Sequence, residues 1–404
     1  FPYIGILKAV IGLVDTGHYS YRELYTETDL LTGGLTPVTN QYTDARDFSR
    51  RKITFELKGK AFHQNLEDAL RLAQEMLLKS DFSDTKRLAE ILAELKSRMQ
   101  SSMIGAGHTV ASGRALSYLS ETAALQEVLS GMDFYRLVER LTGNWEEEKE
   151  LLPGRLQALA REIFCRENLM LDFIAQEEEQ YERFAKGAAA FARELYPAPE
   201  TSEPFRVRPE KKNEGYLSAS QVQYVCRAGN FVQKGLAYTG ALRILKGIFN
   251  NDYLWNNVRV KGGAYGCMCS FGKSGDSFLV SYRDPNLSRT IGVYEQAPDF
   301  VERFAGDERA MTQAVIGTIS EMDTPLNPAA RGLRALSLYL TCQSEEDLQR
   351  ERDQVLDATA EDIRALAGHI RAILEADCLC VVGGEKKIRE EKELFLTLEQ
   401  LYQG

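Results

Sequence analysis

Histidine is scarce in this chain of 404 residues, which contains only four. They stand at His18, His63, His108 and His369, and no two are spaced as metal ligands on one helix face. The patterns H-x-x-x-H, H-E-x-x-H and reversed H-x-x-E-H, which place two zinc ligands about one helical turn apart, are therefore absent. The sequence predicts no metal site built from a pair of histidines.

The seven cysteines do not resemble a disulfide framework, because their number is odd and their spacing is irregular. We expect free thiols in a reducing compartment, either a bacterial cytoplasm or a mitochondrial matrix. Cys267 and Cys269 share one face of a predicted strand, and so do Cys378 and Cys380. These two pairs either form a four-thiolate zinc site or act as small apolar core residues.

Other absences exclude further classes of protein. No apolar run reaches the roughly 18 residues of a membrane span, no G-x-G-x-x-G follows a strand, and no G-x-S-x-G is present. Dinucleotide-binding and serine-hydrolase readings therefore have no anchor. The formal net charge of −10 is opposite to that of a typical nucleic-acid binder. We expect neither a nucleic-acid nor a membrane partner.

The N-terminal stretch is apolar, but it has neither a basic leader region nor a small-residue cleavage site. Its residues Ile4, Leu7, Val10, Ile11 and Val14 fall on one helical stripe, which predicts a core helix. Because the chain starts at Phe1 rather than methionine, we interpret it as a processed product or an excised piece.

Proline marks the main seam of the chain, between residues 197 and 212. This stretch is rich in proline and charge and poor in aliphatic residues, as a linker between domains requires. We therefore divide the chain into a domain at 1–196, a linker at 197–212 and a domain at 213–404.

The same pattern occurs in both halves, which indicates a duplicated domain. YRELYTETDLLTGGLTPVTNQY and NDYLWNNVRVKGGAYGCMCSF each run from a helical pattern through Gly-Gly into a strand. Later, ENLMLDFIAQEEEQYERFAK and ADCLCVVGGEKKIREEKELF each predict a short apolar strand, a turn and a charged helix. Strands with alternating polarity, such as KITFELKGKAF, combine with long helices. The predicted fold is α+β, with two homologous domains that each carry an antiparallel sheet covered on one face by helices.

The segment from Arg259 to Tyr265 carries the strongest candidate for chemistry. A helix that ends near Arg259, a turn at Gly262 and Gly263, and a strand entered at Tyr265 bring a cation and a phenol to the same space. Together they can bind a carbonyl or a developing oxyanion. Aligning the two Gly-Gly pairs puts Leu30 opposite Arg259 and Thr36 opposite Tyr265. The glycines therefore serve the fold in both copies, while the polar pair occurs in one.

A second conspicuous motif is Asp284-Pro285-Asn286, which follows the strand SFLVSYR. Aspartate is a good helix N-cap and proline a good first helical residue. The motif predicts a strand-to-helix transition with Asp284 as the cap.

At these residues the chain resembles a known family. LWNNVRVKGGAYG and FLVSYRDPNL are similar to the fourth domain of presequence-protease-like enzymes, a branch of the insulinase/pitrilysin-type zinc peptidases. KAVIGLVDTGHYSYRELYTETDLLTGGL is similar to the third domain, whose first strand would precede Phe1 and be missing here. Family members bind zinc through H-x-x-E-H and a distal glutamate in an N-terminal half that this chain lacks.

The resemblance implies four related domains in two halves that enclose a chamber, with this chain as the non-zinc-binding C-terminal half. Arg259 would hold a substrate carbonyl, and Tyr265 would be the catalytic residue that stabilises the oxyanion. Gly262 and Gly263 would form the structural turn, and no residue of this chain would bind a metal. Zinc-activated water from the absent half would be the nucleophile.

The implied activity is that of a zinc metallo-oligopeptidase acting on unstructured peptides, with the N-terminal half of the same polypeptide as its partner. The chain alone is expected to be inactive. The alternative is a catalytically silent structural or peptide-binding protein on the same fold.

Overall fold

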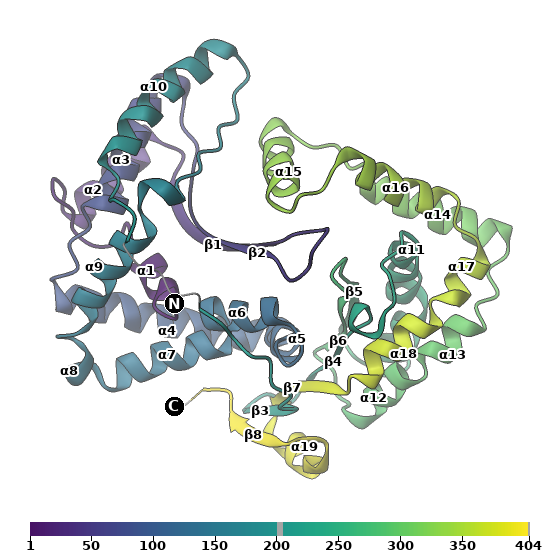
Figure 1. The fold of residues 1–404 in the computed structure, drawn as a ribbon. Coiled ribbons are helices and arrows are strands. Elements are labelled where there is room, and N and C mark those ends of the chain that lie inside the picture. The colour runs from purple at the N-terminus through teal and green to yellow at the C-terminus, as the bar shows by residue number, and fades with distance from the viewer. Residues whose placement is uncertain (200–204, 403–404) are drawn as a thin grey trace.

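The computed structural model describes residues 1–199 and 205–402, whose ribbon is shown in Figure 1. Its first half consists of helices around one antiparallel hairpin, β1 (Leu35–Thr43) and β2 (Arg51–Gly59). The helices of this half are α1 (Ile4–Val10), α2 (Tyr21–Leu31), η1 (His63–Asn65), α3 (Leu66–Leu78), α4 (Thr85–Gly105), α5 (Gly107–Ser117), α6 (Glu121–Ser130), α7 (Met132–Gly143), α8 (Trp145–Glu148), α9 (Leu152–Ile163), η2 (Arg166–Asn168) and α10 (Glu178–Glu194).

The apolar N-terminal stretch lies in the core of this first half. Leu7, Val10, Ile11 and Val14 are buried against α3, α4, α7 and α9, as their helical stripe predicts. The helix itself ends at Val10, earlier than the stripe does. Gly12 allows this end because its φ of +82° is accessible to glycine at low cost.

The second half contains a six-stranded sheet in the order β5-β6-β4-β7-β3-β8. The strands are β3 (Glu214–Ser218), β4 (Tyr224–Asn230), β5 (Gly266–Phe271), β6 (Asp276–Tyr282), β7 (Cys378–Gly384) and β8 (Thr397–Gln400). The pairs from β5 to β7 are antiparallel, but β3 is parallel to both β7 and β8. The predicted antiparallel sheet is therefore a mixed sheet.

Helices of the second half cover one face of that sheet. They are η3 (Val232–Lys234), α11 (Ala241–Ile248), η4 (Phe249–Tyr253), η5 (Trp255–Val260), α12 (Ser288–Glu295), α13 (Ala297–Glu302), α14 (Glu308–Met322), α15 (Pro328–Leu340), α16 (Glu345–Leu356), α17 (Ala360–Ala365), α18 (Ala367–Glu375), α19 (Glu385–Glu390) and η6 (Lys392–Leu394). Residues that point to this face, such as Leu379 and Val381, join their apolar core.

The opposite face of the sheet is covered by the first half. Cys380 and Val382, which alternate with Leu379 and Val381, pack in a core that includes Ala111 and Ala115 of α5. Every residue of β4 and β7 is buried, as expected for strands covered on both faces. The prediction of helices on one face only is therefore wrong for this sheet, because a helix from the other half supplies the second layer.

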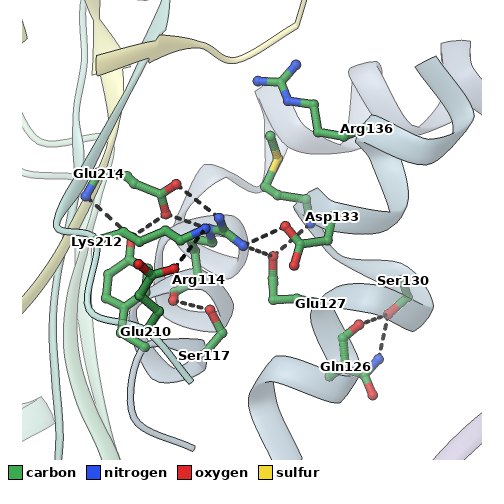
Figure 2. A network of polar contacts seen from close by, with 12 residues as sticks. Arg114, Ser117, Gln126, Glu127, Ser130, Asp133, Arg136, Glu210, Lys212 and Glu214 are labelled. Atoms are coloured by element: carbon green, nitrogen blue, oxygen red, sulfur yellow. Dashed lines mark hydrogen bonds and ion pairs between the residues drawn. The ribbon is translucent and has the colours of Figure 1, made fainter. Parts of the chain in front are cut away.

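A buried charge network also joins the halves (Figure 2). Arg114 of α5 donates to both carboxylate oxygens of Glu214 on β3, at 2.5 and 3.0 Å, and to Asp133 of α7 at 2.8 Å. The hydroxyl of Tyr118 donates to Glu214 at 2.7 Å. Glu127 of α6 lies 3.5 Å from the same guanidinium. The two halves therefore share both an apolar core and a set of buried charges.

The repeated pattern is present in part. In both halves a helix leads through Gly-Gly into a hairpin, α2 into β1–β2 and η5 into β5–β6. The later pair differs, because β7 and α19 form in the second half while residues 169–175 form no strand ahead of α10. The predicted strand in ENLMLDFIAQ is therefore wrong. Of the expected linker at 197–212, residues 200–204 lie outside the described residues, and residues 205–212 form neither helix nor strand.

Candidate functional site

The site begins where a wide helix meets a glycine turn. Helix α11 continues into the π-helical segments η4 and η5, a rare geometry that is frequent at functional sites. The turn after η5 requires glycine twice. Gly263 has a φ of +84°, and a Cβ on Gly262 would lie 2.3 Å from the carbonyl oxygen of Val258. The chain therefore reverses tightly from η5 into β5.

This turn places Arg259 beside Tyr265. The guanidinium carbon of Arg259 lies 3.9 Å from the ring centre of Trp255 and 5.7 Å from that of Tyr265. Both distances fit cation–π contacts, which hold the cation between the two rings. Within residues 1–199 and 205–402, the Arg259 guanidinium has no hydrogen-bond or ion-pair partner, so its N–H donors are free for a ligand.

Tyr265 is the exposed member of the pair, with 65% of its surface accessible, and Trp255 is 41% accessible. The backbone N–H of Tyr265 donates to the carbonyl of Tyr282 at 3.1 Å, and its ring meets the ring of Tyr282 edge-on at 5.8 Å. The Tyr265 ring is therefore positioned by β6 while its hydroxyl group remains available as a donor.

The motif Asp284-Pro285-Asn286 supports the turn rather than capping a helix. The side-chain amide of Asn286 donates to the carbonyl of Gly262 at 2.6 Å. Buried Asp284 accepts from the Asn286 backbone N–H at 2.9 Å and from the Thr290 hydroxyl at 2.6 Å. Helix α12 begins only at Ser288, with Leu287 at its N-cap position. The predicted N-cap role of Asp284 is therefore wrong, because its carboxylate is used inside the loop.

The first half extends the aromatic surroundings of the site. The ring of His108, on α5, meets Tyr282 edge-on at 4.9 Å and lies 6.2 Å from Tyr224. Its Nδ1 atom is buried without a hydrogen-bond partner in the described chain. Burial lowers the pKa of His108, which favours the neutral imidazole. The aromatic row of Tyr265, Tyr282 and His108 thus crosses from one half to the other.

The cysteines do not gather into a metal site. Cys267 and Cys269 pack toward the helices of the second half, whereas Cys378 and Cys380 lie on the opposite face of the sheet. Burial raises the pKa of Cys267 to about 11, although the positive charge of Arg259 opposes the shift. Among the described residues, no group of three or more His, Cys, Asp or Glu side chains could hold a metal ion. The donor set of these residues does not fit zinc.

The corresponding turn of the first half lacks the polar pair. Gly34 adopts a φ of +102°, so the glycine turn is repeated. Leu30, opposite Arg259, is 71% exposed on α2, and Thr36, opposite Tyr265, is exposed on β1. The two turns share their backbone design and differ in the groups they present.

Sequence reasoning missed Trp255 and the role of Asn286. Trp255 precedes Arg259 by four residues, a spacing that puts the two side chains on one helix face and could have indicated their contact. No such signal exists for Asn286, because its contact with Gly262 spans 24 residues and depends on how the loops fold. The contribution of His108 depends on packing between the halves.

One further finding concerns membranes: no helix among the described residues has the length and apolar character of a membrane span.

Two family models match the chain. A model of the region associated with peptidase family M16, subfamily C, matches residues 1–141, and "PreP C-terminal domain" matches residues 213–382. Protein HypA of Clostridium perfringens is 33% identical over 400 residues, covering 99% of this chain and 41% of the relative. Presequence protease 1, chloroplastic/mitochondrial, of Arabidopsis thaliana is 28% identical, covering 88% of this chain and 33% of the relative. The chain thus spans about two fifths or less of the length of these relatives.

Solved structures share the fold. A conserved protein from Enterococcus faecalis superposes with a TM-score of 0.63 at 14% identity, covering 95% of this chain and 90% of that one. A peptidase M16 inactive domain from Pseudomonas fluorescens gives 0.58 at 15% identity, covering 93% and 86%. The mixed helix-and-sheet fold, the two family models and the sequence relatives agree: the chain is a homologue of the presequence proteases and belongs with the peptidases of the M16 family.

Proposed function

We propose that this chain is the non-zinc-binding C-terminal half of a zinc metallo-oligopeptidase that degrades unstructured peptides. The observation that carries the proposal is the pairing of Arg259 and Tyr265 at a glycine turn, with the Arg259 guanidinium 5.7 Å from the Tyr265 ring centre. The free donors of both residues, and the absence of the pair from the equivalent turn at Gly34, support a site added to a repeated scaffold.

In this proposal Arg259 binds a substrate carbonyl near the scissile bond. Its guanidinium is permanently charged and presents several N–H donors in one plane. The Trp255 and Tyr265 rings restrict its motion, so less freedom is lost when it binds. Its role is to hold the peptide backbone.

Tyr265 donates its hydroxyl hydrogen to the oxyanion that develops when the carbonyl is attacked. Preorganised donors of this kind contribute on the order of 3 kcal/mol to transition-state stabilisation. The backbone and ring contacts of Tyr265 with Tyr282 provide the preorganisation. Zinc belongs, in this proposal, to the N-terminal half of the same polypeptide.

The organisation that we propose is a pair of related domains, 1–196 and 213–404, joined by a linker at 197–212. The shared helix, glycine turn and hairpin support it. Seven free cysteines support a reducing compartment, which we propose to be a bacterial cytoplasm or a mitochondrial matrix.

The test uses a longer protein that contains both halves and an unstructured peptide as substrate. We expect Tyr265→Phe to lower kcat/KM on the order of 100-fold and Arg259→Ala to lower it as well. Tyr25→Phe is a matched control, because Tyr25 is as exposed as Tyr265, at 65%. Arg309→Ala, at an exposed position of α14, is the control for the arginine.

Two results would contradict the proposal. Unchanged kcat/KM in both site variants would remove the roles of Arg259 and Tyr265 and favour a silent peptide-binding protein on the same fold. Chelator-sensitive peptide cleavage by residues 1–404 alone would remove the two-half arrangement.

A further inference from the structure

The hairpin of the first half has one strand with an open edge. β2 pairs with β1 over all nine of its residues, and within the described residues it pairs with no other strand. No residue of β2 is buried, whereas four of the seven residues of β6 are. An open edge presents a row of unpaired backbone groups, which folded proteins usually cover.

This open edge lines a large cavity. The cavity has a volume of about 2260 Å³ and is bounded by β2, α3, α10 and residues 168–176. Its walls include Phe55 and Leu57 of β2, Leu70 of α3 and Phe184 of α10. A typical small-molecule site has roughly 300–1,000 Å³, so this space is larger than one small ligand requires. Figure 1 shows the hairpin as a long curved ribbon leading away from α3 and α10.

The second half shows what occupies the same place in a complete sheet. There the hairpin β5–β6, which follows its own glycine turn, pairs through β6 with β4, and β4 pairs with β7. In the first half β2 stands in the place of β6, and residues 169–175 stand in the place of β7. The place of β4 is the cavity.

This arrangement explains why residues 169–175 form no strand despite their strand-like sequence. A strand needs a neighbour for its backbone hydrogen bonds, and the neighbour that β7 has in β4 is missing here. Leu169, Leu171 and Phe173 therefore line the cavity.

The order of elements along the chain indicates the source of the missing strand. β4 precedes the helix and glycine turn of its own half, so its counterpart would precede α1. Phe1 lines the cavity and stacks on Phe205 with ring centres 4.3 Å apart, so this end of the described chain lies at the cavity itself. Pro37 lies in β1 and β2 has no proline, which suits β1 as the outer strand and β2 as an inner one.

We infer that the cavity is the seat of an extended β-strand from the segment that precedes Phe1 in a longer protein. This strand pairs with the open edge of β2 on one side and with residues 169–175 on the other. It carries apolar side chains at alternate positions, which fill the space between β2 and helices α3 and α10. The inference rests on the proposed internal repeat and does not depend on peptidase activity.

Hydrogen exchange in a longer protein that contains the segment before Phe1 tests this inference. Alternate N–H groups of a strand point to opposite edges, so a strand paired on both sides protects consecutive amides. We expect consecutive amides of β2 to be protected at least about 100-fold over unpaired peptide groups, and residues 169–175 to be protected also. β1 is the matched control, because as the outer strand it should protect only alternate amides.

Each other outcome overturns the inference. If β2 exchanges in the alternating pattern of β1, its edge is open and no strand occupies the cavity. If protection of β2 disappears on dilution, the occupant is a second copy. If protection arises only after an unstructured peptide is added, the occupant is a ligand.

Discussion

At the scale of single residues, the site depends on a position where no side chain fits. A Cβ on Gly262 would meet the carbonyl oxygen of Val258 at 2.3 Å, and a backbone atom cannot move aside as a side chain can. We expect Gly262→Ala to lower the free energy of unfolding by about 1–3 kcal/mol, because the backbone must shift to make room. Urea unfolding measures the loss.

Gly317 provides the matched control for this substitution. It lies inside α14, and a Cβ there would meet nothing within 4 Å. Gly317→Ala should therefore stabilise the chain by about 0.5–1 kcal/mol, since alanine favours a helix interior. A Gly262→Ala protein as stable as the unchanged chain would show that the turn is not as tight as described.

At the scale of elements, the loop between β6 and α12 holds the glycine turn in place. Asn286→Ala removes the hydrogen bond to the Gly262 carbonyl and should cost about 1 kcal/mol of stability. In a longer, active protein it should also lower kcat/KM about tenfold or more, because Arg259 and Tyr265 lose their alignment.

Asn65→Ala separates these two effects. Asn65 also donates from its side-chain amide to a backbone carbonyl, that of Leu31, at 3.0 Å and in a partly buried setting. It lies far along the chain from the turn, so its loss should cost similar stability and leave kcat/KM unchanged. If Asn65→Ala lowers kcat/KM as much as Asn286→Ala, the loop has no positioning role.

Local signals predict the elements better than they predict their partners. The strand at KITFELKGKAF and the helix–glycine–hairpin unit of each half depend on alternation and on glycine, and the structure contains both. The parallel pairing of β3 with β7 joins residues more than 160 positions apart, which no local pattern encodes. The strand expected in ENLMLDFIAQ failed for the same reason, because a strand is completed by its neighbours.

The candidate site follows the same division. Arg259, Tyr265 and the two glycines stand within seven residues, so local geometry was sufficient to bring them together. Asn286 and His108 come from other loops and from the other half, and their contacts depend on tertiary packing.

At the scale of the whole molecule, the buried charges between the halves make stability depend on pH. One cation, Arg114, faces the carboxylates of Glu127, Asp133 and Glu214. Burial raises the pKa of Glu127 to about 7, with its more distant contact to Arg114 only partly opposing the shift. Burial also opposes ionisation of Glu214, but the Arg114 hydrogen bonds outweigh it and lower the pKa of Glu214.

Because the pKa of Glu127 is raised in the folded chain, its stabilising contribution is present below about pH 4.5 and is lost as pH rises toward 7. We expect the unchanged chain to lose up to about 3 kcal/mol more stability than Glu127→Gln between pH 5 and pH 8. Glu214 acts in the opposite direction and only at lower pH, so it does not mask the difference. Urea unfolding at the two pH values measures it, and equal slopes for both proteins would show that Glu127 is ionised throughout.

The placement of α5 on the sheet of the second half has a consequence for how the chain folds. β4 and β7 bury one face under helices that follow in their own half and the other under a helix made more than 100 residues earlier. A chain synthesised from its N-terminus therefore forms α5 before the surface it covers exists. The last folding event closes a core to which both halves contribute, so the molecule should gain and lose its native state as one cooperative unit.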